Sequence, residues 1–209
     1  LGTVSGLSGD YTLEAWVYAD SLSTWGRIFD LGNGQESNNI FVGFYGDTGR
    51  IILSNRVNGN TYSELVTTGN LPLGQWVHVA AVNNGNGTGA IYFNGVQQTT
   101  TGSVSAGFAV DRANSYVGRS NWAVDDYFRG QINQIRIWND ARTQSEIYNS
   151  RSGLSAADSI DTNLLGHWER YRLNAMGQVD DLSPANRDAW LVQRNDIVRL
   201  DQFASVKLR

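Results

Sequence analysis

The stretch GQWVHVAAV, residues 74–82, is followed by NNGNGTGA and then by IYFNGVQQ. Apolar residues alternate in the first and third of these segments, which is typical of strands with one buried face, and a Gly/Asn cluster between two such strands indicates a hairpin. The Asn94-Gly95 pair is a second turn signal, of the kind that favours two-residue hairpin loops. The function therefore depends on whether many such hairpins build a catalytic cleft or only a binding surface.

The same period-two pattern recurs at roughly ten-residue spacing along the chain, and each run ends at Gly, Asn or Asp. The runs are residues 11–19, 26–32, 39–46, 50–57, 63–69, 75–82, 89–99, 115–120, 128–139 and 163–171, with weaker runs near 188–193 and 196–208. This pattern predicts an all-β fold, a two-sheet antiparallel β-sandwich or jelly roll. One short edge helix is expected over residues 143–151, where Thr143 and Glu146 form a capping box and Gly153 follows as a stop.

Composition limits the classes of function. The 209 residues are 41% hydrophobic and 17% charged, which predicts a single folded domain over residues 1–209. A net charge of −4 without clusters of Lys or Arg excludes a nucleic-acid footprint. The absence of Cys excludes disulfides and thiolate zinc sites, and no apolar run is long enough to span a membrane. The chain begins with Leu1 in place of Met, so we expect a segment of a longer chain with neighbouring domains.

Several segments together resemble a known superfamily. They are YTLEAWVYADSLSTWGRIFDLGNG, LPLGQWVHVAAV, GAIYFNGVQQ, YFRGQINQIRIWNDARTQSEI and LLGHWE. Over residues 10–170 the chain resembles laminin-G-like and pentraxin-like domains of the concanavalin A-like lectin/glucanase superfamily, most of all the bacterial laminin-G type of large secreted and surface proteins. The resemblance implies a secreted or cell-surface location. After GHW the sequence departs from the family pattern, so the register of the closing strands in residues 171–209 is not predicted.

Four tryptophans are interpreted as core residues, because each is placed on the same alternating face as neighbouring Val, Ile or Leu and a buried indole adds a large apolar area. They are Trp16, Trp76, Trp138 and Trp168. His78 and Arg136 are interpreted as strand residues whose polar groups are satisfied by neighbours.

Catalytic patterns are missing from the sequence. Glucanases with this fold place carboxylates on one strand in an E-x-D-x-x-E arrangement, with the two catalytic carboxyls about 5–5.5 Å apart in retaining enzymes. The nearest pairs here are Glu14 with Asp20 and the adjacent Asp125 and Asp126, and neither pair has that spacing. The two histidines are not accompanied by a G-x-S-x-G elbow. We therefore predict a protein that is not an enzyme.

Two polar loops are the predicted binding regions, NGQESNN (33–39) and GRSNWAVDDY (118–127). In the related families a calcium site at the rim draws on the corresponding loops. The resemblance therefore implies calcium as a cofactor, with the ligand set Asn38, Asn39, Asn121, Asp125 and Asp126, next to Ser120. Relatives carry Asp where this chain has Asn38 and Asn39, which reduces the ligand charge that sets calcium affinity. The alternative is that these residues are solvated turn residues without a metal.

Trp122 is the predicted ligand contact, because a sugar ring stacks on an indole while Asn121, Asp125 and Asp126 supply polar partners. The alternative is that Trp122 folds back over the core. Trp25 and Trp190 are weaker candidates of the same kind, and Tyr18, Tyr45 and Tyr62 are expected to line an outer sheet face.

The leading functional hypothesis is a non-catalytic module that binds carbohydrate or a protein ligand through rim loops, with calcium at the rim. A structural or adhesive spacer between neighbouring domains is the second hypothesis. A glycoside hydrolase or polysaccharide lyase is the third, since carboxylates from distant strands can meet in a fold.

Overall fold

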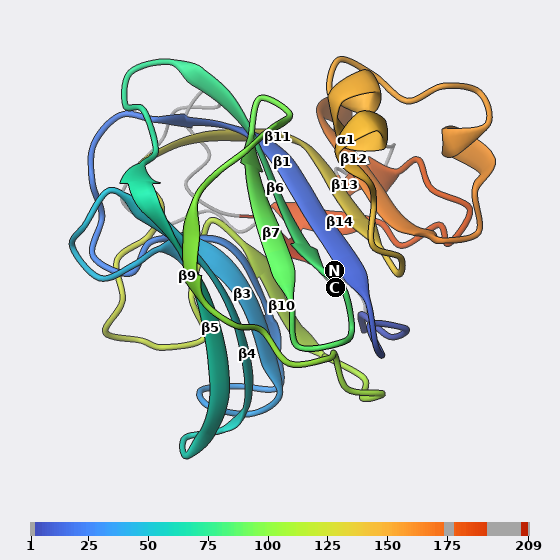
Figure 1. The fold of residues 1–209 in the computed structure, drawn as a ribbon. Coiled ribbons are helices and arrows are strands. Elements are labelled where there is room, and N and C mark those ends of the chain that lie inside the picture. Colours follow the sequence, from blue (N-terminus) through green and yellow to red (C-terminus); the bar gives the residue numbers. More distant parts are fainter. Residues whose placement is uncertain (1–2, 174–177, 192–205, 209) are drawn as a thin grey trace.

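The computed structural model describes residues 3–173, 178–191 and 206–208, and these residues form a two-layered β-sandwich (Figure 1). The strands are β1 Tyr11–Ala19, β2 Arg27–Gly32, β3 Asn39–Phe44, β4 Arg50–Asn58, β5 Thr61–Asn70, β6 Trp76–Asn83, β7 Gly89–Phe93, β8 Val96–Gln97, β9 Thr100–Gly102, β10 Asn114–Val117, β11 Gly130–Trp138, β12 Leu164–Leu173, β13 Gln178–Asp181, β14 Ala189–Leu191 and β15 Val206–Leu208. The helices are α1 Gln144–Ser150 and the 3-10 helix η1 Asp158–Ile160. Neither of these described helices is long and apolar enough to span a bilayer.

Hydrogen bonding joins the described strands in the order β8-β7-β6-β1-β11-β12-β13-β14-β15-β10-β2-β3-β4-β5-β9. The series folds into two layers. We call β8 to β13 in this order layer A and β10 to β9 layer B, and β14 and β15 join them at one edge. Every strand pair is antiparallel, which confirms the predicted fold class.

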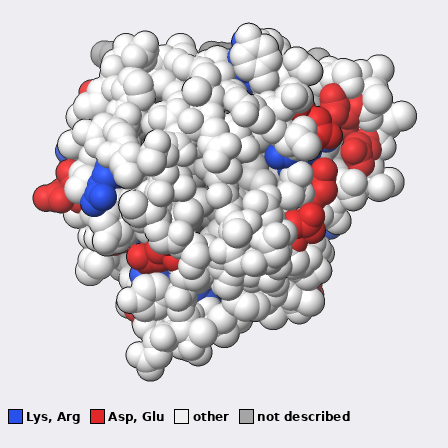
Figure 2. All heavy atoms as spheres, viewed as in Figure 1, with Lys and Arg blue, Asp and Glu red and all other residues white. Residues whose placement is uncertain are grey.

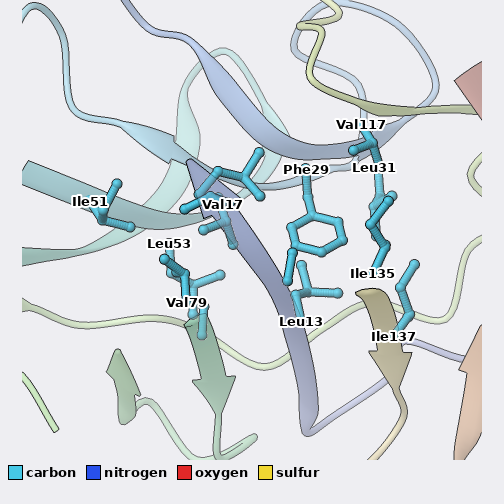
Figure 3. Close-up of a cluster of buried hydrophobic side chains, with 14 of the residues drawn as sticks. Leu13, Val17, Phe29, Leu31, Ile51, Leu53, Val79, Val117, Ile135 and Ile137 are labelled. Carbon is cyan, nitrogen blue, oxygen red and sulfur yellow. The ribbon is translucent and has the colours of Figure 1, made fainter. Parts of the chain in front are cut away.

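The core lies between the inner faces of the two layers (Figure 3). Leu13, Val17, Val79, Ile135 and Ile137 come from layer A, and they meet Phe29, Leu31, Ile51, Leu53 and Val117 from layer B. Each of these side chains is at most 5% exposed. Alternation therefore sends the remaining side chains of each strand to an outer face, and any binding site must be built there or on the loops.

The local turn predictions are confirmed in detail. Asn94 and Gly95 have φ of 52° and 79°, and this left-handed pair turns the chain from β7 into β8. Thr143 caps α1, and its reciprocal hydrogen bonds with Glu146 complete the capping box. Two short strands, β9 and β13, were not predicted, and most of the weak run 196–208 lies outside the described residues.

Two of the four tryptophans predicted in the core, Trp138 and Trp168, are fully buried, at 0% and 1% exposure. Trp168 packs in the cluster between the layers, whereas Trp138 is buried on the outer face of layer A beside Glu14. Trp16 and Trp76 lie on the outer face of layer A, where Trp16 is partly buried and Trp76 is 40% exposed. The prediction was wrong because both faces of β1 and β6 carry apolar residues, so alternation does not reveal which face is inside.

His78 and Arg136 also lie on that outer face, and both are buried. Glu14 lies between them: His78 Nε2 is 3.3 Å from Glu14 Oε2, and Arg136 is 3.6 Å from Glu14 Oε1. Trp138 Nε1 donates to Glu14 Oε1 at 2.8 Å, and Arg136 donates to the Ser150 carbonyl at the end of α1 at 3.0 Å. Burial raises the pKa of Glu14, but these partners outweigh it and hold the pKa below its ordinary value. The segment that carries α1 thus closes over a buried ionic cluster.

Acidic side chains gather on the side of the molecule where α1 lies (Figure 2). Asp140 follows β11 and is close enough to Asp161, Glu146 and Asp10 to interact with their charges, and its Oδ1 is buried without a hydrogen-bond partner among the described residues. Burial raises the pKa of Asp140 to about 6; Arg142 acts in the opposite direction, and Asp161, Glu146 and Asp10 add to the increase.

Asp140→Asn should therefore stabilise the protein at neutral pH. The folded state holds the Asp140 proton more tightly than the unfolded state, so this favourable contribution is complete below pH 3.8, the ordinary pKa, and is lost as the pH rises through about 6. Denaturant unfolding should give the variant a higher free energy of unfolding than the wild type at pH 7 and an equal one near pH 4. The exposed Asp47 supplies the control, Asp47→Asn. An Asp140→Asn variant that is no more stable than wild type at pH 7 contradicts the expectation.

Candidate functional site

The loop of residues 118–127 leaves layer B after β10 and returns to start β11. Its two ends are tied together, since Phe128 N donates to the Gly118 carbonyl at 3.0 Å, and Gly118 N donates to the Ile28 carbonyl of β2 at 3.1 Å. Phe128 stacks on Phe44 of β3 at 5.9 Å between ring centroids. The loop is therefore closed at its base and anchored to the sheet.

This loop encloses a hollow of about 250 Å³, which we call the rim hollow. Its lining residues are Arg119, Ser120, Asn121, Trp122, Ala123, Asp125, Asp126 and Tyr127. The structure thus brings together the four residues predicted as ligand contacts. Asn38 and Asn39, the two predicted metal ligands from the other loop, are not among the residues that line it.

Asp30 of β2 organises the floor beneath the hollow, and its side chain is completely buried. Asn121 donates to it twice, from its backbone N at 2.8 Å and from Nδ2 at 2.8 Å, and Asn39 Nδ2 donates at 3.0 Å. Burial raises the pKa of Asp30, while Arg27 and the amide donors favour its charged form. Asp30 therefore fixes the orientation of Asn121, 91 residues later in the chain.

Arg27, also on β2, connects this floor with the acidic end of the loop. Its Nη2 donates to Asp125 Oδ2 at 2.9 Å, its Nε lies 3.8 Å from Asp30 Oδ2, and its side chain is 3% exposed. Ser120 also donates to Asp125 Oδ2, at 2.7 Å. Burial lowers the pKa of Arg27, and Asp30 and Asp125 oppose that change. Burial likewise raises the pKa of Asp125 against the effect of Arg27.

Trp122 lies against the outer face of layer B and is partly buried. Its ring meets Phe41 of β3 edge to face at 5.9 Å, and the guanidinium carbons of Arg27 and Arg56 lie 5.5 and 5.8 Å from its centroid. Trp122 therefore folds back onto the outer face of the sheet, while the rest of its surface lines the hollow.

The weaker aromatic candidates are distributed elsewhere. Trp25 packs edge to face on Tyr45 at 5.4 Å, in the same outer-face cluster as Trp122 but outside the lining of the rim hollow. Tyr62 is 54% exposed on layer B, and the guanidinium of Arg56 lies over its ring. Tyr18 packs edge to face on Trp76 on layer A, and Trp190 is part of β14.

The predicted calcium ligands do not fit a calcium shell, which needs six to eight oxygens at about 2.3–2.6 Å. Asn121 and Asn39 direct their side-chain N–H groups at Asp30. The side-chain oxygen of Asn39 accepts a hydrogen bond from Ser37 N at 2.8 Å, and the cation beside Asp125 is Arg27. Asn38 is in the left-handed region at φ 56°, and its backbone carbonyl accepts from Arg112 Nε at 2.9 Å. No group of three or more His, Cys, Asp or Glu side chains in the described part of the chain could hold a metal ion.

A family model for the concanavalin A-like lectin/glucanases superfamily matches residues 2–148. The chain belongs to this superfamily. The family resemblance read from the sequence is therefore confirmed. Comparison with curated proteins finds no sequence match.

Three solved structures illustrate the similarity. A putative carbohydrate binding protein from Bacteroides ovatus is 16% identical with a TM-score of 0.62, over 86% of this chain and 52% of its own length. Domain 4 of AbnA, a GH43 extracellular arabinanase from Geobacillus stearothermophilus, in complex with arabinotriose, is 26% identical with a TM-score of 0.53, over 71% of this chain and 69% of its own. The CBM40 of Ruminococcus gnavus IT-sialidase, bound to alpha2,3 sialyllactose, is 14% identical with a TM-score of 0.55, over 69% and 83%. The chain spans only about half of the first protein, and the first and third similarities show the fold alone.

Sequence reasoning missed Arg27 and Asp30. Both lie within the run GRIFDLG, which was interpreted only as a strand. The available signal was a pair of opposite charges three residues apart in an otherwise apolar run, because such charges are rarely buried unless they are paired. Their partners on the loop lie too far along the chain to be inferred from spacing.

Arg27→Met should lower the free energy of unfolding by about 3–5 kcal/mol, because Asp30 and Asp125 stay buried without their cation. Arg56→Met is the matched control: its pair with Glu64, at 2.8 Å, is about one-fifth exposed, against 3% for Arg27, so its loss should lower the free energy of unfolding less. Urea unfolding of both variants measures the difference. Equal losses would contradict the role given to Arg27.

A calcium ion at this rim stays a prediction of the sequence, and the thermal unfolding midpoint tests it. Binding to the folded state alone would raise the midpoint in millimolar calcium. Because the carboxylates already have a cation and amide donors, we expect no difference between calcium and chelator, with magnesium as the control. A rise specific to calcium would show that the network rearranges around the metal.

Proposed function

We propose that this chain is a non-catalytic carbohydrate-binding module and that the rim hollow binds a sugar unit. The observation that carries the proposal is the juxtaposition, in one hollow of about 250 Å³, of a partly buried indole with an amide and two carboxylates. Carbohydrate needs such a mixed surface, because a sugar ring has an apolar C–H face and a rim of hydroxyl groups.

Asp125 and Asp126 can accept more hydrogen bonds than they receive from the protein itself. Asp125 and Asp126 each use Oδ2, the first for Arg27 and Ser120 and the second for Thr24 N and Arg129. A carboxylate accepts about four hydrogen bonds through its two oxygens. The two side chains therefore offer further acceptors for sugar hydroxyls in positions set by the protein.

Preorganisation favours binding at this hollow. The loop is closed at its base, Asn121 is held by Asp30, and Trp122 is held by Phe41, so little side-chain freedom is lost when a ligand arrives. The same contacts argue against catalysis, since Oδ2 of Asp125 is committed to Arg27 and Ser120.

The relative that supports this proposal is domain 4 of the arabinanase, at 26% identity and in complex with arabinotriose. That enzyme is extracellular, which supports a secreted or cell-surface location for this chain as well. We propose arabinose-containing oligosaccharides as the first glycans to test, with neighbouring domains of a longer chain as the setting.

Trp122→Ala should weaken glycan binding at least tenfold, because the stacking surface of the sugar is lost. The free energy of unfolding should fall by only about 1–2 kcal/mol, since Trp122 is partly buried. Isothermal titration with arabinotriose, xylotriose, cellotriose and sialyllactose measures affinity, and urea unfolding measures stability.

Trp25→Ala is the matched control, because Trp25 packs in the same outer-face cluster but does not line the rim hollow. It should lose similar stability and keep full affinity. Wild-type protein that binds none of these sugars would favour the spacer function instead, and new reducing ends after incubation would indicate a hydrolase. Equal loss of affinity in the two variants would place the site elsewhere.

A further inference from the structure

We infer that the outer face of layer A carries a second sugar-binding site, which takes a neutral sugar residue. This inference rests on the proposed function. It is built around a separate hollow of about 360 Å³, lined by Trp16, Trp76, Asn133, Gln134 and Ser152, which we call the outer hollow. Its volume falls at the lower end of the range of small-molecule sites, about 300–1,000 Å³.

Two indoles form the walls of the outer hollow. Trp76 begins β6, and its side chain is 40% exposed, which is unusual for so large an apolar group. Tyr18 meets its ring edge to face at 5.8 Å. Trp16 is fixed by a hydrogen bond from its Nε1 to the Arg151 carbonyl at 2.6 Å and by an edge contact with His78 at 5.5 Å. Both rings are therefore held in place without being covered.

A β-bulge places Gln134 at this hollow. Between the pairs Glu14↔Arg136 and Trp16↔Asn133, β1 advances two residues and β11 three, so β11 contains one extra residue. Gln134 lies in that interval with φ 48°. Bulges of this kind redirect a side chain and are common beside active sites. The left-handed conformation suits Gly or Asn, and Gln adopts it at a cost.

The side chain of Gln134 is the second unusual feature. Its Oε1 is buried and accepts no hydrogen bond within the described residues, while Gln134 N is satisfied by Asn133 Oδ1 at 2.9 Å. A buried carbonyl without a donor is unfavourable. Backbone strain and an unsatisfied acceptor coincide at one residue of this hollow, and a rotation of the amide that exposes Oε1 to the hollow would let a ligand donate a hydrogen bond to it.

The chemistry of the lining selects the ligand class. Two indoles offer apolar ring faces, and Asn133, Gln134 and Ser152 offer amides and a hydroxyl, whereas none of the five lining residues is charged. A neutral sugar residue matches this set, because its C–H face packs on an indole and its hydroxyls donate to an amide carbonyl. An anionic sugar finds no cationic side chain in this lining.

Gln134→Gly and Trp76→Ala test the inference. Glycine relieves the positive φ and removes the unsatisfied carbonyl, so Gln134→Gly should raise the thermal unfolding midpoint and weaken sugar binding at this hollow about three- to tenfold. Gln134→Ala removes the same amide but keeps the strain, so it should weaken binding without that gain in stability. Trp76→Ala should weaken binding at least tenfold. Leu73→Ala is the control and should not change binding, because Leu73 is also an exposed apolar residue, at 44% exposure, but lies outside the hollow.

Fluorine NMR of protein labelled with 5-fluorotryptophan locates the binding. The chain has seven tryptophans, and single Trp→Phe variants assign the Trp16, Trp76 and Trp122 resonances. On titration with arabinotriose, xylotriose and cellotriose, the Trp16 and Trp76 resonances should shift, including in Trp122→Ala protein, and the shift should weaken in Gln134→Gly.

The outcomes separate this inference from the proposed function. A shift of the Trp122 resonance alone, with the Trp16 and Trp76 resonances unchanged in both the wild type and Trp122→Ala, would overturn the second site and leave the carbohydrate-binding function intact. Shifts of Trp16 and Trp76 with sialyllactose but with none of the neutral trioses would overturn the assignment to a neutral sugar. No shift of any tryptophan with any of these sugars would overturn both.

Discussion

The packing of two apolar sheet faces against each other is the interaction on which the rest of this structure depends. Because each strand sends alternate side chains inward, Leu13, Val17, Phe29 and their partners fill the core, and every intervening residue must face outward. The outward-facing residues are covered to different extents in three regions. The segment with α1 closes over Glu14, His78 and Arg136, the loop of residues 118–127 folds onto layer B, and the indoles at positions 16 and 76 stay partly open. Both candidate binding hollows arise from outward-facing residues that are only partly covered.

Much of this fold could be predicted from the sequence, because its signals are local. Alternation and Gly/Asn clusters reveal the strands and hairpins, and the capping box reveals α1. The same alternation failed for Trp16 and Trp76, since it gives the two faces of a strand but not which one is buried. In β1 the inner face holds Leu13, Ala15 and Val17, while the outer face holds an indole that neighbouring segments partly cover. Which face is inside depends on tertiary packing, and that information is not in the strand.

The sequence indicates which residues gather at the rim hollow, but not which groups hold them in place. A Trp within a loop rich in Asn and Asp is a local signal, and Asn121, Trp122, Asp125 and Asp126 do line one hollow. The groups that hold them, Arg27 and Asp30, belong to a strand about 90 residues earlier, and only the folded chain brings them together. The bulge at Gln134 is equally invisible, because an extra residue in one strand can be recognised only against the register of its partner.

The two hollows differ in how their polar groups are held, and this difference constrains what they can bind. At the rim hollow, buried charges fix the loop, and acidic oxygens remain beside the indole. At the outer hollow, the amide of Gln134 is neutral and is carried by a backbone in the left-handed region, and none of the five lining residues is charged. The supporting surfaces belong to different layers, whose outer faces point in opposite directions because the inner faces meet in the core. A short oligosaccharide on one face therefore cannot reach across the core to the other face. Two occupied hollows would hold separate glycan segments. Such an arrangement raises avidity for a dense polysaccharide without a stronger contact at either site.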